Sequence, residues 1–117
     1  MNIKTAYIET SKGTYPLVFN LNVMEEIQEK YGSIDAWGGM TDNVDGVSVK
    51  ELKFGVMAMI NEGIDIDNEE NGKNMPMITD KQAGRIMTEI GIEAIFEKIH
   101  ELTISSTKDE DNEGKNE

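Results

Sequence analysis

The chain has 117 residues, the size of one small domain, which predicts a single hydrophobic core. Its 23 acidic residues outnumber 11 lysines and arginines, and the formal charge of −12 excludes ordinary binding to a phosphate backbone. The absence of cysteine excludes disulfides, thiolate metal sites and cysteine nucleophiles. No apolar run reaches the roughly 18 residues of a membrane helix, and no signal-like stretch follows Met1. We therefore expect a soluble protein with no membrane or nucleic-acid partner.

Two short segments near the N-terminus predict a β-hairpin. Residues Ile3–Thr10 and Thr14–Phe19 are rich in β-branched and aromatic residues. Between them lies Ser11-Lys12-Gly13, a turn in which the glycine tolerates positive φ. Pro16 has no backbone donor, which favours an edge position for the second strand. Because two strands alone are marginally stable in water, helices must cover one of their faces.

Capping signals predict the first helix after the hairpin. It begins at Asn22, where Glu25 three residues later completes a capping box, and it ends at Gly32. A short second turn follows at Ser33–Trp37. The next residues, Gly38–Asn43, are expected to form a loop.

The longest apolar stripe predicts a central helix. It is capped by Ser48 with Glu51 and closed by Gly63. The following segment, residues Ile64–Ile78, is acidic, rich in asparagine and contains Pro76. We therefore expect a loop there of about fifteen residues, which is long for a compact domain.

A third capping box, Thr79 with Gln82, opens the last helical region. The apolar phase slips at Gly91, which indicates either a kinked helix or two helices that meet there. Residues Ser105–Glu117 contain no apolar side chain and five acids against two lysines, so a disordered tail is predicted.

These elements predict an α+β fold in which an N-terminal β-hairpin packs against three to four α-helices. Residues 1–104 form one domain, and residues 105–117 form the disordered acidic C-terminal tail. The apolar spacing predicts a common core for one set of residues: Val18, Phe19, Ile27, Leu52, Val56, Ile60, Ile86, Ile95 and Phe96.

No constellation of residues supports catalysis, a cofactor or a metal. His100 is the single histidine, so neither a catalytic triad nor a zinc site can be built from this chain. The acidic run from Asp65 begins like a calcium loop, but Glu70 stands where glycine is needed and Pro76 where the bidentate glutamate belongs. The acidic pairs lie in polar stretches where nothing desolvates them. We therefore expect a protein that is not an enzyme.

Thioethers form adaptable contact surfaces, and eight methionines are present. Those at helical core spacing are expected inside the protein. Four residues in predicted turns and loops are instead candidates for contact with a partner or another subunit: Trp37, Met40, Met75 and Met77.

The segment from Tyr15 to Ile34 resembles the opening of tail assembly chaperones from long-tailed phages of Gram-positive bacteria. The matching features are the Phe19-Asn20-Leu21 step, a helix centred on Glu25-Glu26-Ile27, and the Lys30-Tyr31-Gly32-Ser33 stop. An amphipathic helix that ends in Asn61-Glu62-Gly63, a threonine-capped helical region and a charged tail extend the likeness in layout over most of residues 1–104.

The resemblance implies a non-catalytic protein of the host cell cytoplasm that binds the tape measure protein and keeps it soluble. It also implies that the tail tube protein polymerises around the tape measure with this help, that the chaperone forms homo-oligomers, and that it is absent from the finished virion. The family often makes a longer product by −1 frameshifting. The codons GGA AAA AAC would encode Gly114-Lys115-Asn116 and contain a slippery heptamer, although Gly72-Lys73-Asn74 has the same residues.

Two other functions remain open from the sequence. An acidic protein can mimic the charge of DNA and occupy a nucleic-acid-binding protein, but Lys50, Lys53, Lys81, Arg85 and Lys98 interrupt the acidic helix faces. A small structural component of the phage head or tail is the other alternative, because a fold alone does not specify a function.

Overall fold

A computed structural model describes the backbone of residues 5–41 and 48–115 and the side chains of residues 5–41 and 48–103. Residues 1–4 and 42–47, which include the start of the first predicted strand and part of the predicted 38–43 loop, lie outside the described residues. The predicted α+β class is confirmed. The described elements are β1 (Thr5–Thr10), β2 (Gly13–Val18), α1 (Leu21–Tyr31), α2 (Ile34–Thr41), α3 (Val49–Asn71), α4 (Asp80–Ile90) and α5 (Ile92–Lys115).

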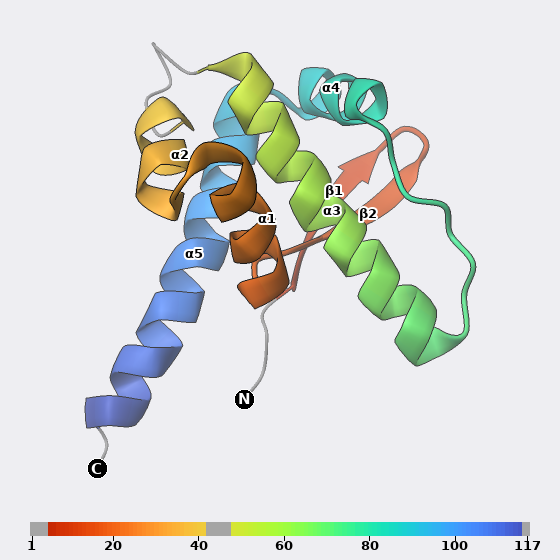
Figure 1. Cartoon of the computed structure of the whole chain (residues 1–117). Helices are drawn as coiled ribbons and strands as arrows, with labels where there is room; N and C mark the ends of the chain where they lie inside the picture. Colours follow the sequence, from red (N-terminus) through yellow and green to blue (C-terminus); the bar gives the residue numbers. More distant parts are fainter. Residues whose placement is uncertain (1–4, 42–47, 116–117) are drawn as a thin grey trace.

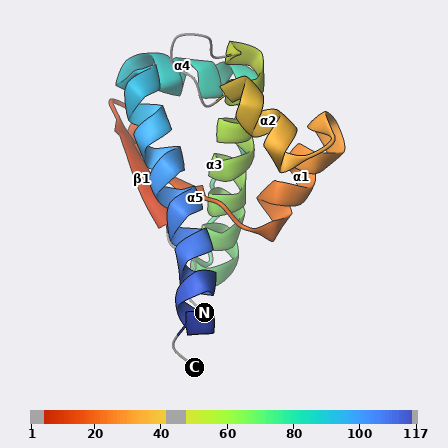
Figure 2. The same cartoon turned by 90° about the vertical axis from the view of Figure 1, so that its left-hand side faces the viewer.

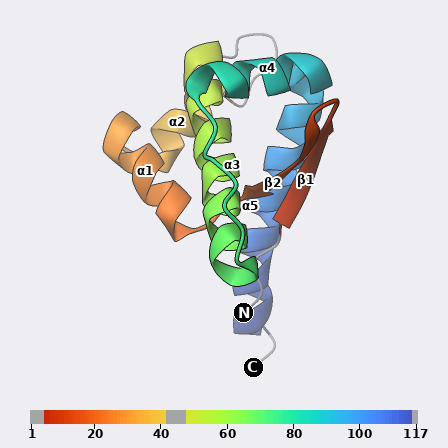
Figure 3. The same cartoon turned by 90° about the vertical axis from the view of Figure 1, so that its right-hand side faces the viewer.

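Helices α3 and α5 form the centre of the molecule. The hairpin lies on one side of them and α1 and α2 lie on the other, as the two rotated views show (Figures 2 and 3). Helix α4 crosses over one end, and α5 begins beside it and runs to the opposite end (Figure 1). The core therefore fills the space between the hairpin and the helices.

The antiparallel hairpin is held to α3 and α4. Thr10 pairs with Gly13 and Tyr7 with Pro16 across the two strands. Pro16 packs on α3, where a Cβ on Gly63 would lie 2.9 Å from the proline ring, so only glycine fits there. At the turn, the backbone N–H of Ser11 donates to Glu89 of α4 at 2.6 Å.

The start of α1 differs from its prediction. The cap is Asn20, whose side chain accepts from the backbone N–H of Val23, and not Asn22. Both asparagines donate to the same carboxylate oxygen of Glu62 on α3, at 2.8 and 2.9 Å. The end at Gly32 is confirmed, with φ of 94° and an N–H that donates to the carbonyl of Gln28. The helix cap thus lies two residues before the predicted one, and both asparagines contact Glu62.

The prediction of a loop at residues 38–43 is wrong for its described part, because α2 continues to Thr41. Trp37 anchors this helix: it is 4% exposed, and its indole lies against α3 where a Cβ on Gly55 would lie 2.9 Å from Cε2. The Thr41 hydroxyl donates to the carbonyl of Trp37. Packing of the indole outweighs the low helix propensity of Gly38 and Gly39, which costs about 1 kcal/mol per residue.

Helix α3 is also longer than predicted. It does not end at Gly63 but continues to Asn71, with Gly72 in the left-handed conformation as its cap. Ile64, just beyond the predicted end, is 1% exposed, so burial sustains the helix. At its start, the hydroxyl of Ser48 donates to the Glu51 carboxylate, and no side chain caps the backbone as the predicted box requires.

The predicted 64–78 loop therefore reduces to a shorter extended segment after α3, residues 73–78, which we call the strap. Two asparagines one heptad apart on α3 hold it. Asn61 bonds both backbone groups of Ile78, at 2.8 and 3.1 Å, and Asn68 bonds both backbone groups of Met75, at 3.0 and 2.9 Å. Each side-chain amide thereby replaces the partner strand that an extended backbone would otherwise need.

The C-terminal region confirms some predictions and changes another. Thr79 and Gln82 form the predicted capping box of α4, and α4 and α5 are separate helices that meet at Gly91. The backbone of residues 105–115 continues α5, whereas the sequence predicted a disordered tail from Ser105. Helix extension from a packed first half adds a hydrogen bond per residue without a new nucleation step.

The predicted core is buried except at one position. Val18, Phe19, Ile27, Leu52, Val56, Ile60, Ile86 and Ile95 are buried, and Phe96 is only partly buried and packs at the edge of the core. Its exposed part belongs to the groove described next.

Candidate functional site

An apolar groove of about 680 Å³ lies between α2 and α5. Ile34 and Trp37 form its α2 side, and Phe96 and Ile99 form its α5 side. Polar side chains of Asp35, Glu97 and His100 also line it. The groove thus combines an apolar floor with a polar rim, the usual composition of a surface that binds another molecule.

Trp37 is one wall of this groove and not an exposed anchor. Its indole N–H donates to the carbonyl of Glu51 at 2.8 Å, so the ring is fixed between α2 and α3. Gly38 and Gly39 follow it along the groove, and a Cβ on either residue would meet nothing within 4 Å. An added side chain at either position would therefore start in open space.

The other three predicted contact residues are exposed but do not form one surface. Met40 is 36% exposed on α2, whereas Met75 and Met77 are 38% and 47% exposed in the strap. Figure 3 shows α2 on one side of α3 and the strap along another. The structure therefore separates Met40 from the two strap methionines.

Sequence reasoning missed the role of Phe96, which it assigned to the core. The apolar stripe of α5 is wide, and periodicity alone does not tell a buried member from one at its edge. Ile95 beside it is fully buried, whereas Phe96 lies at the edge of the same stripe. No local signal marks this difference, because adjacent residues such as Met59 and Ile60 on α3 are both buried in the core.

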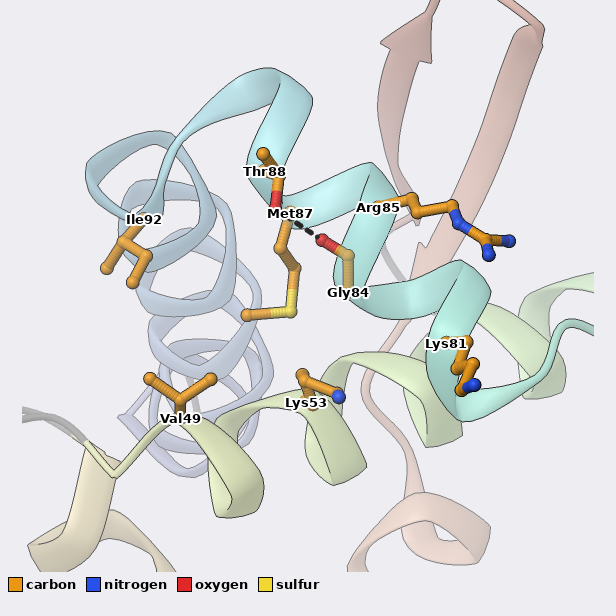
Figure 4. A pocket seen from close by; sticks show the side chains of 8 residues that line it. All are labelled: Val49, Lys53, Lys81, Gly84, Arg85, Met87, Thr88 and Ile92. Carbon is orange, nitrogen blue, oxygen red and sulfur yellow. Dashed lines mark hydrogen bonds between the residues drawn. The ribbon is translucent and has the colours of Figure 1, made fainter.

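A second cavity, of about 580 Å³, lies where the first turns of α3 meet α4 and the start of α5. We call it the basic cavity, because three cationic residues, Lys53, Lys81 and Arg85, line it beside the apolar side chains of Val49 and others (Figure 4). In Figure 4, Met87 points into the space between α3 and α4. The spacing of Lys81 and Arg85, four residues apart, predicts a shared helix face, and this spacing is the local sequence signal for the cavity.

The cations of this cavity are incompletely neutralised. Lys53 pairs with Asp80 at 3.0 Å, and the Asp80 side chain is 60% exposed. Among residues with described side chains, Lys81 and Arg85 have no carboxylate within 4.0 Å. The basic cavity therefore carries positive charge on a molecule whose formal charge is −12.

The surface around α1 has the opposite charge. The expectation that nothing desolvates the acidic pairs is wrong for Glu26: partial burial raises the pKa of its carboxyl group, and the charges of Glu62, Glu29 and Glu25 raise it further. These four carboxylates repel one another. This side of the molecule is therefore unsuited to an acidic partner.

The described side chains contain no cluster of three or more histidines, cysteines or acids that could hold a metal. No helix in the described part of the chain is long and apolar enough to cross a membrane. Comparisons with protein-family models, with curated proteins and with solved structures found no significant match. The groove, the charge and the resemblance in the sequence are the features that bear on function.

Proposed function

We propose that this chain is a non-catalytic binding module whose ligand-binding surface is the apolar groove between α2 and α5. The supporting observation is the groove itself, which exposes Phe96 and Ile34 beside a fixed indole on an acidic molecule. An amphipathic helix commonly binds such a groove through its apolar stripe. The surrounding negative charge keeps the complex in solution and opposes aggregation.

Within this class, we propose the function of a phage tail assembly chaperone that binds the tape measure protein. A long helical protein exposes apolar stripes until the tail tube protein covers it, and the groove has the chemistry to cover one stripe. The resemblance over residues 15–34 supports this choice. The proposal includes action in the host cell cytoplasm, self-association and a longer frameshifted form.

The test is co-expression of the full chain with the tape measure protein of the same phage, followed by copurification and titration. We expect a stable complex. Phe96→Ala removes an aromatic wall of the groove and should weaken binding about tenfold or more, since truncating a central aromatic contact costs about 1.4 kcal/mol or more. The control is Leu21→Ala, because Leu21 is 78% exposed on α1 and does not line the groove.

Different results contradict different parts of the proposal. No complex with the tape measure protein would overturn the chaperone function. Equal affinities of the Phe96 and Leu21 variants would overturn the groove as the binding surface. Presence of the protein in purified particles would favour a structural component, and binding to a nucleic-acid-binding protein in competition with DNA would favour a DNA mimic.

A further inference from the structure

The basic cavity is separate from the proposed binding groove and shares no lining residue with it. It lies at the α4 end of the molecule and gathers three of the chain's 11 lysines and arginines, including the single arginine. Two copies with a formal charge of −12 repel each other over most of their surfaces. A place where one copy is locally positive therefore favours an attractive contact with an acidic part of another copy.

A dense run of acidic residues lies in the last part of the chain. Residues 105–117 contain five acids and two lysines, and four of those acids fall within residues 109–113. These residues follow the packed first half of α5, whose backbone is helical to Lys115. The negative charge of this segment is therefore complementary to the positive charge of the basic cavity.

Geometry excludes contact between this segment and the cavity of the same copy. Ile92, the first residue of α5, lines the cavity, and the helix then runs 24 residues away from α4 (Figures 1 and 2). At 1.5 Å per residue, the end of α5 lies about 35 Å from its start. A second copy is needed to bring the two charges together.

We propose that residues 105–117 of one copy bind the basic cavity of another, through Lys81 and Arg85. The contact joins different surfaces of the two copies, so it is a head-to-tail contact that forms rings or open chains. Lys81 and Arg85 are both exposed on α4, so these ion pairs lie at the surface and are sensitive to salt. This inference rests on the self-association included in the proposed function and specifies its surfaces.

The test measures the mass of the full-length protein alone by sedimentation equilibrium over a range of concentrations. We expect species heavier than the 13.1 kDa chain. Their association should weaken between about 0.1 M and 1 M salt, because the Debye screening length falls from about 10 Å to about 3 Å. Reversing the cavity charges with Lys81→Glu and Arg85→Glu should weaken association about tenfold or more. Reversing the tail charges with Asp109→Lys and Asp111→Lys should do the same.

Combining both reversals in one chain should restore association to within about twofold of wild type, because each copy again offers opposite charges. The tail reversal separates this contact from overall repulsion, since it makes the chain less negative and by repulsion alone would strengthen association. The neutral variants, Lys81→Gln with Arg85→Gln, should weaken association less than the charge reversal does. They provide a second test if the reversal variant does not fold. The matched control is Lys12→Gln with Lys50→Gln, which removes the same charge outside the cavity.

Three results would overturn the inference: a monomer at every concentration, association that is insensitive to the cavity variants in folded protein, or association that survives the tail reversal. Circular dichroism and a cooperative thermal transition establish that each variant is folded. Because the tape measure protein is absent from this experiment, failure here leaves its binding untouched. Failure of tape measure binding likewise leaves self-association standing.

Discussion

At the scale of single residues, two glycines on α3 determine how closely its neighbours approach. Gly55 lies under the indole of Trp37, and Gly63 lies under the ring of Pro16. Both positions are helical and neither requires positive φ, so the absent Cβ is their contribution. The two glycines thus allow α2 to pack closely on one side of α3 and the hairpin to pack closely on another.

Gly55→Ala should destabilise the protein by about 1–3 kcal/mol, because overpacking forces a buried side chain out of its position. Displacement of Trp37 should also shift its fluorescence emission to longer wavelength as water reaches the ring. Urea unfolding and emission spectra measure the two effects.

Gly84→Ala on α4 is the matched control. Its added Cβ would lie 3.6 Å from the Lys53 side chain, an ordinary contact. We expect no loss and a gain of up to about 1 kcal/mol from helix propensity. Equal losses at both positions would contradict the assignment of Gly55 to the indole contact.

At the scale of elements, side-chain amides on α3 replace β-sheet pairing for the strap. Asn61 and Asn68 each satisfy one N–H and one C=O of the extended backbone. Asp67 secures the start of this segment: its hydrogen bond from Lys73 lowers the pKa of the carboxyl group, and a second bond from Asn71 lowers it further. The strap is therefore an ordered element, although it contains neither helix nor strand.

Asn61→Ala should destabilise the protein by about 1–3 kcal/mol, because it leaves the partly buried backbone groups of Ile78 without partners. The Ile78 amide should also exchange its hydrogen faster. Native-state hydrogen exchange with denaturant unfolding measures both effects. Asn71→Ala is the control, since its exposed side chain bonds only Asp67; an equal loss there would contradict the role assigned to Asn61.

At the scale of the whole molecule, acidic charge opposes folding and makes stability depend on pH. Glu26 shows the effect most directly, because burial first and neighbouring carboxylates second raise its pKa above 4.5. A carboxyl group with a higher pKa in the folded state binds its proton more tightly there. The protonated Glu26 carboxyl group contributes its full stabilisation below the pKa of the unfolded state. This stabilisation is lost as pH rises through the pKa of the folded state.

Glu26→Gln should therefore raise the melting temperature near neutral pH, because it removes a charge that the folded state disfavours. The gain should disappear below about pH 4, where the glutamate is protonated in both states. Thermal unfolding across this range measures the difference. Glu9→Gln on β1 removes the same charge elsewhere, and an equal gain there would show that net charge, and not the cluster around Glu26, is responsible.

Local chemistry in the sequence was sufficient for some features. The Thr79–Gln82 box, the stops at Gly32 and Gly91, and the hairpin depend on residues within a few positions of one another. Apolar periodicity was likewise sufficient for most of the core, because a helix face is a property of one segment.

Tertiary contacts decided the features for which local signals pointed elsewhere. The sequence predicted helix ends at or before three glycines, Gly38, Gly39 and Gly63. Burial of Trp37 and Ile64 instead stabilises helices that continue beyond these glycines. The sequence placed Asn61 at the end of the predicted central helix and Asn68 in the predicted loop, and only the tertiary structure shows that both bind the strap. The groove and the basic cavity are each formed by segments distant in sequence, and no local pattern encodes the distance between their walls.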